Sequence, residues 1–421
     1  MSGRRATTRW QWVLRLLTRR IWFRAALFCL FGGALALAGA LAGHAISYTF
    51  ATKVGAKSVD GILGMLASSM LAVTTFSLTA MVSAFSGATS TITPRAVQLL
   101  VDDSTAQNAL ATFLGSFLFA IVGIIALSTG LYGETGRVIL LAGTVAVIVF
   151  IVVTLLRWIE HIARFGRVAD TIDRVERAAT EALGTIACAL DVRSGEHARS
   201  RRTGADVRAT TMGRVTHIDL AELGEIAEEA DTDIDVHVLP GEWVDPEHAL
   251  ATLSIAADEE VTRRVRQSFT LAPHRAFDHD PRFGLVVLSE IASRALSPAV
   301  NDPGTAISVI EAGGRVLLRL FDQPEDEFAS VPGRVRMRAL RLSDLLEDFC
   351  RPIARDGAGM IEVGVRLQKT LAALAAHTPA AKAIIKREAD DAVDRARDAM
   401  TSARDIALIE RVRAEAFADG T

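Results

Sequence analysis

The sequence predicts a bundle of four transmembrane α-helices followed by a C-terminal cytosolic α+β domain, which has a small β-sandwich and a mostly helical remainder. Charge is unevenly distributed along the 421 residues: residues 1–165 contain 13 Lys and Arg against 5 Asp and Glu, whereas residues 166–421 contain 33 against 44. The first part holds four long stretches without a charged residue, and the second part changes between helical and strand periodicity. This pattern excludes a simple soluble enzyme and a purely membrane-embedded transporter.

Four stretches without Asp, Glu, Lys or Arg predict the membrane spans. They are 28, 34, 30 and 19 residues long, and comprise Ala25–Thr52, Gly61–Pro94, Ser104–Gly133 and Val138–Leu156. A helix needs about 20 apolar residues to cross a hydrocarbon core about 30 Å thick. We therefore predict a transmembrane domain over residues 23–160, with helices at residues 23–48, 62–86, 109–131 and 137–160.

Arginines at both ends of this domain predict its orientation. Six arginines lie in the basic N-terminal segment 1–22, and Arg157, Arg164 and Arg167 lie at the other end. Anionic lipids and the membrane potential favour such clusters on the cytoplasmic side. With four spans, both termini and the α+β domain are expected in the cytoplasm, and the protein is expected in the inner (plasma) membrane.

The second predicted span carries a face of small and hydroxylated residues. On a helix with 3.6 residues per turn these residues fall within about 80° of one another. They are Ser68, Ala72, Thr75, Thr79 and Ser83. Two interpretations stay open: the face packs closely against another helix, or it lines a water-filled pore in a homo-oligomer.

The chain changes period after the membrane domain. Residues 161–190 are predicted to continue the fourth span as a helical stalk, and residues 209–257 to form a small β-rich subdomain. Its expected strands are Gly213–Asp219, Asp233–Leu239 and Leu250–Ala256, with a helix at Leu220–Ala230. The run resembles the small β-sandwich of biotinyl and lipoyl domains, but no lysine occupies a hairpin tip, so carriage of either cofactor is not expected.

The remainder is predicted to be helical, with a helical domain at residues 258–378 and a C-terminal helical run at residues 379–421. The expected helices of the first are Glu259–Leu271, Arg282–Leu296, Asp302–Leu320, Pro332–Ile353 and Ile361–His377. In the C-terminal run, alanines recur at alternating spacings of four and three, which is typical of a closely packed seam. Packing of this seam in the protein's own core is favoured over packing between subunits.

The most distinctive local sequence is Ala295–Ala306, which reads ALSPAVNDPGTA. Pro298 is expected to stop one helix, while Asp302 caps the next and Pro303 takes its first position. One interpretation is therefore a capped corner between two helices. The other is a polar pocket for an anion at a helix N-terminus. Its candidate residues are Arg275, Asp278, Arg294, Ser297, Asn301, Asp302 and Thr305.

The loop before this corner carries Asp278, His279 and Asp280, which are residue types that bind divalent metals. Such dense spacing favours a solvated turn, and a pair between Arg275 and Asp278 is a further interpretation. No GxxxxGK[ST], HExxH or GxSxG motif is present. We therefore expect no catalytic residue, no metal and no cofactor; an enzyme that uses this loop is kept as a third hypothesis.

Several short motifs together resemble a bacterial membrane-protein family catalogued as domain of unknown function 2254. They are Ser68-Ser69-Met70, Phe76-Ser77-Leu78, Pro94-Arg95 and the ALSP, NDP and TA groups of Ala295–Ala306. The resemblance covers most of residues 20–375. Gly304 departs from it, because a bulkier residue is expected there. The resemblance implies a bacterial membrane protein and supplies no reaction, substrate or catalytic residue.

The functional expectation is an oligomeric channel or transport-type protein with a cytosolic domain that gates or senses. The alternative is a non-conducting membrane scaffold or signalling protein. The expected partners are the lipid bilayer, further copies of the chain, and a small ion or anionic ligand. Nucleic acid is not expected, because the C-terminal part is acidic overall.

Overall fold

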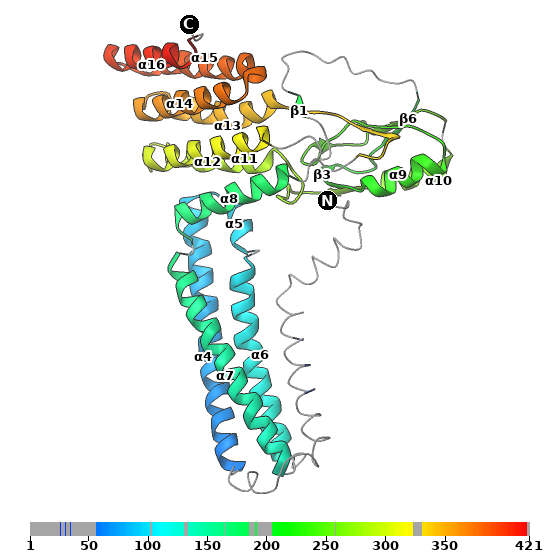
Figure 1. Ribbon diagram of the computed structural model, residues 1–421, viewed down its shortest axis with the longest axis vertical. Helices are drawn as coiled ribbons and strands as arrows, with labels where there is room; N and C mark the ends of the chain where they lie inside the picture. Colours follow the sequence, from blue (N-terminus) through cyan, green and yellow to red (C-terminus); the bar gives the residue numbers. More distant parts are fainter. Residues whose placement is uncertain are drawn as a thin grey trace. The chain divides into compact units, whose positions relative to one another are not determined.

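The structure is a computed structural model, in which residues 56–101, 103–129, 134–164, 166–184, 190–191, 204–256, 258–322 and 331–418 are described, together with the single residues 26, 30 and 34. The chain forms two compact units (Figure 1). We call residues 56–90 and 97–167 the membrane unit, and residues 91–96 and 168–418 the α+β unit. The basic segment 1–22 lies outside the described residues, as does the predicted span 23–48 apart from those three single residues.

The membrane unit is built from helices. They are α4 (Ala56–Thr91), α5 (Pro94–Val101), α6 (Ser104–Ser128) and α7 (Glu134–Arg164). Within the described residues, three stretches are long and apolar enough to cross a membrane: Val59–Gly87, Ser104–Ser128 and Arg137–Arg164. They coincide with the predicted spans 62–86, 109–131 and 137–160. The count of four includes residues 23–48 and stays a prediction.

Close packing of α4 against α6 forms part of the core of the membrane unit. Leu63 of α4 and Phe113 of α6 are fully buried there. A Cβ atom on Gly123 would lie 3.0 Å from a methyl group of Leu63, so the missing side chain lets the two helices pack closely. Asp103 begins α6 as its N-cap, and accepts a 2.9 Å hydrogen bond from the backbone N–H of Ala106.

A glycine separates the last membrane helix from the next helix. Gly166 has φ +76°, a backbone conformation that ends a helix readily when no side chain is present. The next helix, α8 (Val168–Leu183), belongs to the α+β unit. The predicted continuous stalk over residues 161–190 is thus interrupted by a turn.

Two main sheets lie in the α+β unit. The first has the order β2-β6-β4-β8 and the second β5-β3-β7. The strands are β2 (Ala205–Arg208), β3 (Gly213–Ile218), β4 (Ile234–Val236), β5 (Trp243–Val244), β6 (Ala249–Leu253), β7 (Phe269–Ala272) and β8 (Val335–Met337). Both sheets and α9 (Leu220–Glu229) share one core, in which Leu223, Ile226 and Leu253 are fully buried.

Two predicted helices are wrong in part, because they contain strands. After α10 (Glu259–Gln267) the chain turns at Ser268 and pairs as β7 with β3. The segment expected as a helix at Pro332–Ile353 begins with β8, which pairs in parallel with β4. A short β9 (Leu340–Arg341) then pairs with β1 (Leu190–Asp191).

The helices of this unit stack in layers (Figure 1). They are α11 (Phe283–Ala295), α12 (Pro303–Phe321), α13 (Leu342–Asp356), α14 (Ile361–His377), α15 (Lys382–Ala399) and α16 (Ala403–Ala416), with a 3-10 turn η2 (Pro379–Ala381). The alanine seam of α15 is buried at Ala389, Ala392 and Ala396. Gln368 of α14 donates a 2.8 Å hydrogen bond to the Ala389 carbonyl oxygen, so the seam packs within one chain.

Candidate functional site

An arginine-lined pocket of about 830 Å³ is a candidate site in the α+β unit. Its wall is formed by the turn after β4, by β5, by the loop before α11 and by the segment after β8. Five of the residues that line it are arginines: Arg214, Arg275, Arg282, Arg336 and Arg338. A pocket of this size fits a small organic ligand.

Arg275 binds a buried carboxylate beneath this pocket. Its Nε and Nη2 atoms donate to the two oxygens of Asp280 at 2.6 and 2.8 Å, and the Asp280 side chain is 3% exposed. Asp280 Oδ1 also accepts the backbone N–H groups of Arg282 and Phe283, both at 3.1 Å. The structure therefore pairs Arg275 with Asp280, while Asp278 is exposed.

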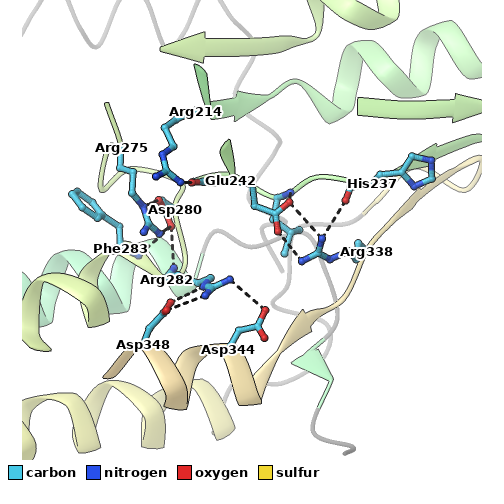
Figure 2. Close-up of polar contacts among 12 residues, drawn as sticks. Arg214, His237, Glu242, Arg275, Asp280, Arg282, Phe283, Arg338, Asp344 and Asp348 are labelled. Atoms are coloured by element: carbon cyan, nitrogen blue, oxygen red, sulfur yellow. Dashed lines mark hydrogen bonds and ion pairs between the residues drawn. The ribbon is translucent and has the colours of Figure 1, made fainter. Parts of the chain in front are cut away.

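Arg282 extends the network to α13. Its Nε and Nη2 atoms donate to Asp348 at 2.6 and 2.9 Å, and Nη1 donates to Asp344 at 3.3 Å. Burial works against the charge of Arg282, but the hydrogen bond and the charge of Asp348 outweigh it and raise the pKa of the guanidinium. Figure 2 shows these pairs side by side beneath Asp280.

The turn after β4 carries Glu242 and requires a glycine before it. Gly241 has φ +93°, and a Cβ atom there would overlap the Asp280 carboxylate. Glu242 accepts a 2.7 Å hydrogen bond from Nη2 of Arg338 and a 3.2 Å bond from the backbone N–H of Leu239. Four of the five arginines thus have a carboxylate partner, since Arg336 binds Asp235 at 2.8 Å.

Two arginines of the pocket keep unused hydrogen-bonding capacity. Arg214 donates to the Gly241 carbonyl oxygen at 3.0 Å and lies 5.5 Å from the ring centre of Trp243, with no carboxylate partner in the described part of the chain. The buried Nε of Arg338 has no acceptor within that part either. In Figure 2, Glu242 lies between these two arginines. The pocket therefore offers N–H donors to a bound group.

Two histidines lie beside the same loop. The rings of His217 and His279 are 4.9 Å apart, and His217 is almost fully buried. Burial and the nearby His279 lower the pKa of His217, while Asp219 opposes them. Within the described ranges, no group of three His, Cys, Asp or Glu residues is placed to hold a metal ion.

The corner at Ala295–Ala306 satisfies its polar groups locally. Asp302 caps α12, accepting from the backbone N–H of Thr305 at 3.1 Å and from its hydroxyl at 2.7 Å. These hydrogen bonds lower the pKa of Asp302. Ser297 donates to the Arg294 carbonyl oxygen at 2.7 Å, and Asn301 has φ +51°. This geometry is that of a capped corner, and Arg275 lies in the arginine-lined pocket instead.

The small-residue face of α4 is exposed in the membrane unit at all five positions: Ser68, Ala72, Thr75, Thr79 and Ser83. The hydroxyl groups of Ser68, Thr75 and Thr79 donate to carbonyl oxygens of the preceding turn at 3.0–3.1 Å. The hydroxyls are therefore satisfied without a partner from outside the helix.

Four residues that line the pocket, and two carboxylates that bind Arg282, were not predicted as site residues from the sequence: Arg214, Glu242, Arg282 and Arg338, with Asp344 and Asp348. The sequence Pro240-Gly241-Glu242 is typical of a turn, and this is the local signal that the sequence offers. The network joins residues up to 101 positions apart, such as Asp235 and Arg336, so sequence spacing could not reveal it.

Comparison with known proteins identifies one family. The chain matches the family described as "Predicted membrane protein (DUF2254)" over residues 18–373. No curated protein and no solved structure matches the chain. The family match covers far more than half of the chain, and three apolar helices of the described part agree with it. The chain is therefore a member of the DUF2254 family of membrane proteins.

Proposed function

We propose that this protein is a membrane-bound receptor for a small anion, which binds in the arginine-lined pocket of the α+β unit. Arg214 carries the proposal, because its guanidinium lines the pocket without a carboxylate partner in the described part of the chain. Arginine presents several donors in a planar arrangement that suits phosphate and carboxylate oxygens. The unpaired Nε of Arg338 adds a second donor.

The charges around the pocket limit the ligand to a small number of anionic groups. Arg275, Arg282, Arg336 and Arg338 are each neutralised by a carboxylate. Arg214 contributes the remaining full positive charge. A ligand with one phosphate, diphosphate or carboxylate group therefore matches the pocket better than a polyanion, which the neighbouring carboxylates would repel.

Isothermal titration of the full-length protein in detergent with phosphate, pyrophosphate and acetate tests this proposal. We expect saturable binding of at least one of these anions. Arg214→Gln should weaken it about 10- to 100-fold, since a hydrogen bond to a charged group contributes about 1.5–3 kcal/mol.

Arg366→Gln is the control, because Arg366 is an arginine of α14 that lies outside the pocket and whose partner is Glu311. It should leave the affinity unchanged. If none of the three anions binds, or if Arg214→Gln and Arg366→Gln behave alike, the proposal is wrong.

We further propose that the membrane unit responds to this ligand, as an oligomeric channel or transport-type protein of the inner membrane with both termini in the cytoplasm. Recording from planar bilayers with and without pyrophosphate tests conduction. The alternative is a non-conducting scaffold, which the back-bonded hydroxyls of the α4 face favour, since such a face suits helix packing. Silent bilayers together with subunit cross-links through Thr75→Cys would support the scaffold.

A further inference from the structure

Glu290 of α11 holds residues 91–96, which we call the α4–α5 connection and which comprise the end of α4, the link Ile92–Thr93 and the start of α5. The Thr93 hydroxyl donates to Glu290 Oε2 at 3.2 Å, and Arg95 forms an ion pair with Oε1 of the same carboxylate. This connection belongs to the α+β unit, where Ile92 and Ala96 are buried. A single carboxylate thus binds two side chains of a segment that follows the membrane helix α4 and continues into α5.

The other end of α11 forms part of the arginine-lined pocket. Arg282, the residue before the helix, lines the pocket, and its backbone N–H donates to Asp280 together with that of Phe283. Asp280 in turn binds Arg275, another residue of the pocket wall. Gly241, whose carbonyl oxygen accepts a hydrogen bond from Arg214, is packed against the Asp280 carboxylate. An anion that binds Arg214 therefore acts, through Gly241 and Asp280, on hydrogen bonds at the start of α11.

The body of α11 is rigidly packed. Leu285, Val287 and Leu288 are fully buried between the two ends, and a Cβ atom on Gly284 would overlap Ala179 of α8. Eight residues separate Arg282 from Glu290, which corresponds to about 12 Å along a helix. A close-packed helix moves as one body when one end is displaced.

We propose that α11 couples the pocket to the α4–α5 connection: an anion in the pocket changes how Glu290 holds Thr93 and Arg95. This inference rests on the proposed function, because it needs a ligand in the pocket. Coupling between two sites is reciprocal, so loosening the connection must change the affinity of the pocket by the same factor.

Pyrophosphate titration of full-length variants is the first test. Glu290→Gln removes the charge that binds Arg95 and keeps the shape of the side chain. We expect it to change the affinity at least fivefold, which is the low end of allosteric coupling. Arg95→Gln should change the affinity in the same direction. Because both substitutions break the same ion pair, the affinity of the double variant should differ from that of Glu290→Gln by less than fivefold.

The matched control is Glu311→Gln, a glutamate of the adjacent α12 that pairs with Arg366. It should leave the affinity unchanged within twofold. If Glu290→Gln resembles this control while the wild-type protein binds pyrophosphate, the coupling is wrong and the proposed function stands. Wild-type protein that binds none of the probe anions overturns both.

Hydrogen exchange gives a readout that a merely structural role of Glu290 would not move. Saturating pyrophosphate should change the exchange rates of the Ile92 and Ala96 amides at least threefold in the wild-type protein. The change should be lost in Arg214→Gln at the same pyrophosphate concentration. Unchanged rates in wild-type protein that has bound pyrophosphate would overturn the coupling.

Discussion

Asp280 is predicted to be the most sensitive position of the arginine-lined pocket. It is buried and accepts four hydrogen bonds, two from Arg275 at 2.6 and 2.8 Å and two from backbone N–H groups at 3.1 Å. Removing one partner of a buried ion pair costs about 3–5 kcal/mol, because the other charge stays behind uncompensated. We therefore expect Asp280→Ala to lower the free energy of unfolding of the α+β unit by about 4 kcal/mol.

Asp280→Asn should cost less, about 2 kcal/mol, since its amide oxygen still accepts the two backbone N–H groups. Arg275 also keeps some stabilisation, because its guanidinium lies 5.0 Å from the ring centre of Phe283. In a unit of this size, 1 kcal/mol corresponds to a change in Tm of about 2–4 °C. Scanning calorimetry of the full chain in detergent should thus show a fall of about 8–16 °C for the alanine variant.

Asp398→Asn is the internal control, because Asp398 is an exposed aspartate of α15 that lies outside this network. It should change the free energy of unfolding by less than about 0.5 kcal/mol. A double-mutant cycle between Arg275→Ala and Asp280→Ala should give a coupling energy above about 1 kcal/mol. Equal effects of the two aspartate variants, or a cycle without coupling, would refute the assigned pairing.

Three further predictions concern other parts of the α+β unit. Burial raises the pKa of the Cys350 thiol, so it should resist maleimide at pH 8 in the folded protein and react once urea unfolds it. The pKa of His217 lies below its ordinary value of 6.5, so the unfolded chain binds the proton better. The free energy of unfolding should therefore fall as the pH drops through about 6.5. Equal urea midpoints at pH 5.5 and 7.5, or the same difference between the two midpoints in His217→Gln, would contradict this. Gly313→Ala should cost about 1–3 kcal/mol in thermal unfolding, since its Cβ would overlap the buried ring of Phe349, whereas Gly359→Ala has open space and should be neutral.

Hydropathy predicted the membrane helices well within the described residues, because a segment in lipid must satisfy its backbone hydrogen bonds internally. The boundaries were less accurate. The helix expected from residue 109 begins five residues earlier, at Ser104, because Asp103 caps it there. Hydropathy averaged over a window does not detect a polar N-cap that is followed by a polar first turn, so it places the start of the helix too late.

Strands were predicted where the alternation was local. Gly213–Asp219 and Leu250–Ala256 correspond closely to β3 and β6. By contrast, β7 and β8 have only four and three residues, and their surroundings fit a helical period equally well. Their partners are distant in sequence, so the pairing that makes them strands could not be seen.

In the candidate site too, contacts between sequence neighbours were predictable, whereas contacts between distant residues were not. The Asp302 cap of α12 depends on neighbours and was predictable. The ion pair of Arg275 with Asp280 depends on how the loop folds, so the spacing of the residues did not reveal it. Arg282 and Asp348 are 66 residues apart and meet only in the folded α+β unit.

The parallel pairing of β4 with β8 has a consequence for biosynthesis. Ile234 faces Val335, so about 100 residues leave the ribosome between the two strands. At roughly 5–20 residues per second this takes on the order of 5–20 s. During that interval the nascent sheet presents a bare edge, which invites association with other chains. Chaperone capture of the emerging polypeptide, or synthesis slowed at low temperature, should therefore improve the yield of intact protein.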